Sequence, residues 1–129
     1  MSLRDTKVDG KQPPDAAEET YCRKLDLNYL RLGPQKWWSP TPGPVPADAN
    51  VKRYLEVMDD PANYPVLVHC FAGIHRTGQY LAIYRMEYER WDNAAALEEM
   101  RANGYVTLDD EEDVFDYLKA YTPRWKRNK

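Results

Sequence analysis

The segment that most constrains the fold is residues 65–91, where a short apolar run leads through a glycine-containing turn into a helical pattern. Residues 65–69 are apolar and valine-rich up to His69, which is typical of a buried parallel strand. From residue 76 to 91, large side chains recur at helical spacing, at Tyr80, Ile83, Tyr84, Tyr88 and Trp91. A buried strand that leads directly into a helix indicates an α/β domain.

The remaining patterns favour the same fold class. Imperfect alternation predicts a second strand over residues 25–32, and the polar stretch 5–19 predicts a loop that ends in a helical turn. Further helices are expected from Asp48 to about Asp59, from Asn93 to Gly104, and from Asp110 to Pro123. We therefore predict a small, mainly parallel sheet flanked by helices in one domain over residues 1–129, without repeats.

The composition limits the partners of this domain. The 129 residues are 43% hydrophobic and 30% charged, with a net charge of −3. This charge does not favour attraction to nucleic acid or to an acidic membrane. No run approaches the roughly 20 apolar residues of a membrane helix, and the N-terminus has no apolar signal segment. We expect a cytoplasmic protein with neither nucleic acid nor membrane as a partner, a setting that also keeps thiols reduced.

Residues 33–46 carry five prolines, two glycines and the pair Trp37 and Trp38. This composition is incompatible with a helix or a central strand, so it predicts a long loop. Loops longer than about 12 residues are often binding or active-site loops. Two interpretations of the tryptophans stay open: a lid or wall against an aromatic substrate, or packing of the loop onto the domain.

The turn after the predicted strand has the parts of an anion site. Cys70 begins it, and Arg76 follows six residues later. The first N–H groups of a helix are unpaired, and the helix dipole makes their surroundings positive. The same field stabilises a thiolate, and thiols so placed have a pKa of about 3.5–7.5. Gly73 permits the turn that points N–H groups inward, and the Thr77 hydroxyl would lie beside the thiol.

These groups fit nucleophilic displacement at phosphorus. Cys70 would attack in line and form a cysteinyl-phosphate, which water would then hydrolyse. The guanidinium of Arg76 would hold two phosphate oxygens. The predicted phosphate-binding residues are Phe71, Ala72, Gly73, Ile74, His75 and Arg76.

No cofactor or metal is expected, because the N–H groups and the arginine supply the positive charge. A zinc site would need three or four ligands at suitable spacing, and the chain has two cysteines and two histidines, none at finger spacing. His75 could add charge to the site or sense pH, but its side chain could equally point away from the amides.

The sequence from His69 to Gly78 resembles the HCxxGxxRTG signature loop of the protein tyrosine phosphatase superfamily. The likeness is to the compact, atypical dual-specificity branch, and it covers roughly residues 20–122. The resemblance implies that Cys70 is the nucleophile, Arg76 the phosphate clamp, Thr77 a support for the thiolate and His69 the residue behind it. It also implies hydrolysis of phosphotyrosine, with phosphoserine and phosphothreonine left open.

The proton donor is less evident. Many dual-specificity enzymes carry an acidic residue upstream of the cysteine, in the stretch that here is the predicted loop 33–46. No Asp or Glu lies between Leu27 and Ala47 of this chain. Asp48, 22 residues before Cys70, is the predicted general acid. Its alternative role is that of a helix N-cap. The other candidates are Asp15, Asp26 and the Asp59–Asp60 pair.

Family members also carry strands and a helix before the counterpart of residues 3–4. The resemblance therefore implies a phosphatase domain without its usual N-terminal part and a sheet with an open edge, through which copies could associate. The expected substrate is a phosphorylated protein or a small phosphomonoester. The alternatives are a phosphoinositide or inositol-polyphosphate phosphatase, which the uncharged Phe71, Ala72 and Ile74 disfavour, and an inactive phosphate-binding module, which has no need of a reactive thiol.

Overall fold

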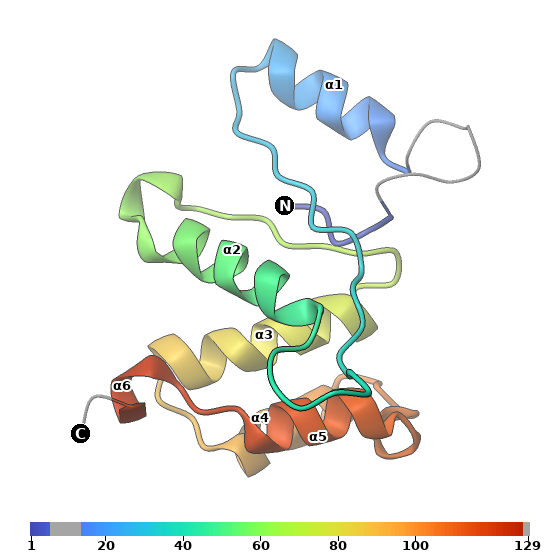
Figure 1. The fold of residues 1–129 in the computed structure, drawn as a ribbon. Coiled ribbons are helices and arrows are strands. Elements are labelled where there is room, and N and C mark those ends of the chain that lie inside the picture. The colour runs from blue at the N-terminus through green and yellow to red at the C-terminus, as the bar shows by residue number, and fades with distance from the viewer. Residues whose placement is uncertain (6–13, 128–129) are drawn as a thin grey trace.

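Helix α3 (His75–Tyr88) runs through the middle of the molecule, with α2 on one side and α4 and α5 on the other (Figure 1). The computed structural model describes residues 1–5 and 14–127. In these ranges the helices are α1 (Ala16–Lys24), α2 (Ala47–Asp59), α3, α4 (Asn93–Ala102), α5 (Glu112–Ala120) and α6 (Arg124–Arg127), with 3₁₀ turns η1 (Pro61–Asn63) and η2 (Leu108–Asp110). No helix in the described part of the chain is long and apolar enough to cross a bilayer.

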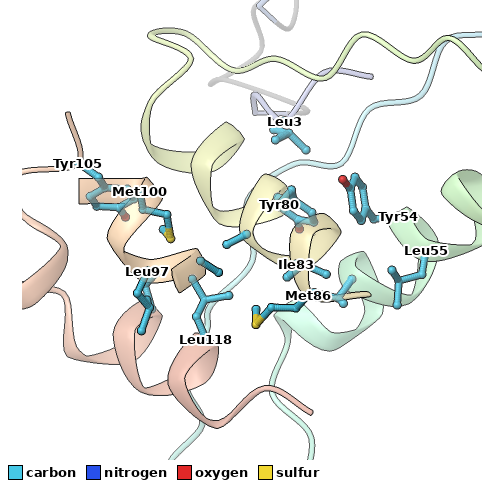
Figure 2. Packing of buried hydrophobic residues seen from close by; sticks show 14 of the residues in the cluster. Leu3, Tyr54, Leu55, Tyr80, Ile83, Met86, Leu97, Met100, Tyr105 and Leu118 are labelled. Carbon is cyan, nitrogen blue, oxygen red and sulfur yellow. The ribbon is translucent and has the colours of Figure 1, made fainter. Parts of the chain in front are cut away.

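The core forms where the apolar faces of these helices meet. Helix α2 buries Val51, Leu55 and Met58 at the spacing expected from the sequence, together with Tyr54. Figure 2 shows side chains that pack together around α3. Leu3 and Tyr105 come from outside the helices, and the helical ones include Tyr80, Ile83, Met86, Leu97, Met100 and Leu118. Each large apolar side chain that is fully buried contributes about 1.5–3 kcal/mol. This packing fixes α3 and therefore the loop that precedes it.

Helix α3 ends earlier than the predicted 76–91. Arg90 has φ 58°, a left-handed conformation that cannot continue an α-helix. The N–H of Trp91 instead turns back to the carbonyl of Arg85, at 3.1 Å. A residue with positive φ just beyond a helix is a common way to end one, and an arginine at that position gives no sequence signal for it.

The predicted parallel sheet is wrong: the described residues contain no strand. Two isolated parallel bridges occur instead, from Ser2 to Arg31 and from Ser2 to His69. The N–H of Leu3 donates to the His69 carbonyl at 2.8 Å, but pairing on both sides stops after Ser2 and its immediate neighbours. Residues 25–32 and 65–69 have strand-like composition, yet a β-ladder needs several successive partner residues. The N-terminal segment around Ser2, which lies between them, supplies too few. The open sheet edge expected for self-association is therefore absent from the described residues.

Helix α1 lies apart from the helical body, beyond residues 1–4 (Figure 1). It is longer than the helical turn expected in the stretch 5–19, and residues 6–13 of that stretch lie outside the described residues. None of its residues is buried. Polar contacts hold it instead: Arg4 pairs with Asp15 at 2.7 Å, and Glu18 with His69 at 2.7 Å.

Candidate active site

The loop from Cys70 to Ile74 joins the extended segment 65–69 to the first turn of α3. Gly73 has φ 73°, and this left-handed conformation costs a residue with a side chain about 1–2 kcal/mol. Ile74 directly precedes the helix, which begins at His75. The glycine therefore makes the turn that places backbone N–H groups around Cys70. We call the backbone of residues 71–76 the anion cradle.

The sulfur of Cys70 lies inside a set of donors. The Thr77 hydroxyl donates to it at 3.1 Å, and the backbone N–H groups of Ala72, Gly73 and Thr77 also point to it. Partial burial by itself raises the pKa of the thiol, but these four hydrogen bonds outweigh it and lower the pKa from 9.0 to about 7. Near neutral pH a substantial share of Cys70 is therefore thiolate, which is the nucleophilic form.

Arg76 lies in the first turn of α3, half-buried. Its Nη1 donates to the carbonyl of Leu3 at 3.4 Å. Among the described residues no carboxylate pairs with its guanidinium, so its remaining N–H groups are available to an anion. The neighbouring Phe71 ring is 85% exposed at the rim of the loop, and the guanidinium of Arg4 lies 5.3 Å from its centroid.

His69 directly precedes Cys70 and contacts α1. Its Nε2 is 2.7 Å from a carboxylate oxygen of Glu18, and its Nδ1 is 3.2 Å from the carbonyl oxygen of Cys70. His75 points elsewhere: its ring packs edge-on against Tyr105, 4.7 Å between centroids. Of the two interpretations of His75, the geometry favours a side chain directed away from the anion cradle.

Asp48 lies in the first turn of α2, where both of its oxygens are occupied. One accepts from the N–H of Val45 and the other from the hydroxyl of Tyr117, each at 2.7 Å. Helix α2 begins at Ala47, and Pro46 is its N-cap. Asp48 is therefore not the N-cap, although its carboxylate accepts a hydrogen bond from the N–H of Val45. No hydrogen bond or ion pair joins Asp48 to residues 69–78 in the described structure.

The two tryptophans of the Pro-rich loop differ. Trp37 packs edge-on against Tyr80 and Tyr117, with centroids 5.9 and 4.8 Å apart. This contact attaches the loop to α3 and α5. Trp38 is 60% exposed. Packing onto the domain thus accounts for Trp37, and Trp38 is the ring left at the surface.

The structure places Thr77 and backbone N–H groups of the anion cradle around the sulfur of Cys70, and it places His69 against the carbonyl of Cys70. Glu18 and Arg4 were not predicted. Both lie far from the loop in sequence, Glu18 by 51 residues from His69. Neither belongs to a recognisable motif, and no sequence signal could have found them.

Comparison with known proteins agrees with this geometry. Residues 41–116 match a family model described as DSP-PTPase phosphatase fused to NAD+ kinase. The chain is 46% identical over 56 residues to the dual specificity protein phosphatase TpbA of Pseudomonas aeruginosa, an alignment that covers 43% of this chain and 26% of TpbA. It is 36% identical over 118 residues to OCA1 of Mycosarcoma maydis, which carries the name of a tyrosine-protein phosphatase, covering 81% and 71%.

A third relative is inositol diphosphatase DSP3 of Arabidopsis thaliana, 33% identical over 93 residues, covering 70% of this chain and 44% of DSP3. No solved structure matches the chain. The chain belongs to the protein tyrosine phosphatase superfamily, in its atypical dual-specificity branch. The match to TpbA spans only about a quarter of that relative's length.

Proposed function

We propose that this domain, residues 1–129, is a cysteine-dependent phosphatase that hydrolyses phosphomonoesters through a cysteinyl-phosphate. The observation that carries the proposal is the Cys70 thiol, whose pKa of about 7 results from the hydroxyl and backbone donors around it. The sulfur attacks phosphorus, the S–P bond forms and the P–O bond to the leaving group breaks. Water then attacks the cysteinyl-phosphate, which releases inorganic phosphate and restores the thiolate.

During both steps the anion cradle and Arg76 stabilise the equatorial oxygens of the phosphoryl group. Fixed N–H donors aimed at developing negative charge lower the barrier, because they need no reorganisation during the reaction. Arg76 binds two oxygens at once through its planar fork. Thr77 and His69 act on the thiolate rather than on the substrate.

The test uses Cys70→Ser and Arg76→Ala with an aryl phosphate as substrate. Cys70→Ser abolishes turnover but still binds phosphate or vanadate, since the N–H donors are unchanged. Arg76→Ala weakens both turnover and oxyanion binding. Retained turnover by Cys70→Ser would exclude the cysteinyl-phosphate mechanism. Absence of turnover in the wild-type protein together with intact oxyanion binding would identify a binding module instead.

For the proton donor to the leaving group, we propose Asp48. The lack of any other Asp or Glu in residues 28–48 supports this assignment. Asp48→Asn should slow hydrolysis of alkyl phosphates far more than that of activated aryl phosphates, because good leaving groups need no proton. Equal slowing of both substrates would assign Asp48 to its hydrogen bonds with Val45 and Tyr117 alone.

For the substrate, we propose phosphorylated protein, with phosphotyrosine favoured over phosphoserine and phosphothreonine. The exposed Phe71 ring at the rim offers a contact for an aromatic leaving group, and the variable positions of the loop carry no lysine. The second candidate is an inositol phosphate, which the names of the plant relatives favour. Phosphotyrosine peptides and inositol polyphosphates compared at equal concentration separate the two by kcat/KM. We also propose a cytoplasmic location, because a nucleophilic Cys70 has to stay reduced.

A further inference from the structure

Glu18 contacts the base of the catalytic loop from a helix distant in sequence. Its Oε1 lies 2.7 Å from Nε2 of His69, and the two side chains are partly exposed, 36% and 21%. Because α1 has no buried residue, apolar packing does not explain how α1 is held at this position. The Glu18–His69 contact, together with the Arg4–Asp15 ion pair, is therefore a specific polar connection between α1 and the active site.

Both ring nitrogens of His69 face oxygen atoms that can only accept. Nε2 faces the Glu18 carboxylate at 2.7 Å, and Nδ1 faces the carbonyl of Cys70 at 3.2 Å. A neutral imidazole carries one N–H and can donate at only one of these positions, whereas an imidazolium donates at both. The two acceptors thus match the doubly protonated ring and leave either neutral tautomer with one nitrogen facing an oxygen without a proton.

We infer that Glu18 is a positioning residue that holds His69 in its doubly protonated form next to the Cys70 thiolate. The inference rests on the proposed phosphatase function and names a residue that acts on its nucleophile. Glu18 does not touch the substrate. It fixes the plane of the His69 ring, whose Nδ1 faces the carbonyl of Cys70 at 3.2 Å, and it balances the charge of the ring. A positive charge on the residue that precedes Cys70 then favours the thiolate.

Other titratable groups share this environment. The amino group of Met1 donates to the carbonyl of Leu67 at 2.6 Å. Burial lowers the pKa of this amino group, while the charges of Glu18 and Cys22 act in the opposite direction. Arg4 and Asp15 pair with each other nearby. The test therefore leaves all of these groups unchanged and alters only the charge of residue 18.

The first measurement is the protonation of His69 by nitrogen-15 NMR of the imidazole groups at pH 7. The chain has two histidines, His69 and His75. The signals that disappear in His69→Asn are those of His69. In the wild-type protein both nitrogens of His69 should carry a proton. Glu18→Gln keeps an acceptor at the same place without the charge, and should leave one proton on the ring. A singly protonated wild-type ring, or no change in Glu18→Gln, would overturn the inference.

The second measurement is the alkylation rate of Cys70 by iodoacetamide against pH, followed by mass spectrometry so that Cys22 does not interfere. Glu18→Gln should move the midpoint upward by up to about one pH unit and slow alkylation at pH 6 by up to about tenfold, since the pair is partly exposed. Glu19→Gln is the matched control, because Glu19 pairs with Arg23 on the same helix, and its profile should equal that of the wild type.

A double-mutant cycle separates action through His69 from any other effect. In a His69→Asn background, Glu18→Gln should no longer change the alkylation profile; a persistent shift would refute action through the ring. Alkylation and NMR need no turnover. A protein that fails to hydrolyse phosphomonoesters would therefore refute the proposed function and leave this test intact. If Glu18→Gln loses its cooperative unfolding transition, the NMR measurement on the wild-type protein decides the question.

Discussion

The hydroxyl of Thr77 donates to the sulfur of Cys70 at 3.1 Å, from the first turn of α3, the helix that follows the loop. Thr77 itself is buried, and its backbone N–H also points to the sulfur. One residue therefore supplies two of the donors that lower the pKa of the thiol. Its position is fixed by α3, so the reactivity of the nucleophile depends on the packing of the helix as well as on the loop.

Removing this hydroxyl should raise the pKa of Cys70. In the wild-type protein, alkylation of Cys70 should follow a midpoint near pH 7. Thr77→Val should move the midpoint toward the ordinary thiol value of 9.0, and the acidic limb of kcat/KM should move with it. Thr122→Val serves as the control, because it removes an exposed hydroxyl that donates to the Ala120 carbonyl and is not bonded to Cys70 in the described part of the chain. An unchanged midpoint in Thr77→Val would assign the low pKa to the backbone donors alone.

The same shift has a consequence for stability. The folded pKa of Cys70, about 7, lies below the value of 9.0 that serves for the unfolded chain. Between these values the unfolded state binds more protons, so this group's contribution is fully present above pH 9 and is lost as the pH falls through 7. The pH dependence of urea unfolding should therefore be weaker over pH 7–9 in Cys70→Ser than in the wild type. Equal slopes in this range would contradict the lowered pKa.

Gly73 and Gly78 should respond oppositely to alanine. At Gly73, with φ 73°, a side-chain carbon would meet no atom within 4 Å, so Gly73→Ala costs about 1–2 kcal/mol of backbone strain alone and turns N–H donors away from Cys70. Gly78 lies within α3, where an added carbon would make ordinary contact with Tyr105 at 3.8 Å. Gly78→Ala should therefore stabilise the helix by about 0.5–1 kcal/mol. Activity and urea unfolding of both variants check this contrast, and equal loss of activity in both would contradict it.

The buried carboxylate of Glu87 should be among the more important polar groups for stability. Its side chain is 2% exposed and pairs with Arg124 at 3.0 Å, while the Tyr121 hydroxyl also donates to it. Glu87→Gln leaves these donors less well paired and should lower the free energy of unfolding by about 1–3 kcal/mol. The loss is smaller than for a fully buried ion pair, because Arg124 is 43% exposed. Glu89→Gln breaks only a surface pair with Arg85 and should cost at most about 0.5 kcal/mol. Similar costs in urea unfolding would refute the difference.

The loop from Cys70 to Ile74 could be located from the sequence because its parts are local. Cys70, Gly73 and Thr77 lie within eight positions, and a strand-like run before a helix is enough to place them. The same local signals misled the prediction of a sheet: residues 65–69 have the composition of a buried strand, but whether a strand forms depends on partners elsewhere in the chain. Ser2 supplies one bridge on each side and no more among the described residues. The contact of Glu18 with His69 joins residues 51 positions apart. It depends on tertiary structure alone, so no sequence pattern could predict it.

Tyr54 offers a test of the core packing. It is fully buried, and its hydroxyl has no hydrogen-bond partner among the described residues; burial also raises its pKa. A buried hydroxyl without a partner costs about 1–3 kcal/mol, so Tyr54→Phe should stabilise the protein by up to about that amount while the ring keeps its edge-on contact with Tyr80 at 5.0 Å. Tyr105 is the matched control, since it is also fully buried and its hydroxyl donates to Glu111 and accepts from Gln79, each at 3.0 Å. Tyr105→Phe should destabilise by about 1 kcal/mol. Thermal unfolding compares the two, and a loss of stability in Tyr54→Phe would show that its hydroxyl is bonded in solution.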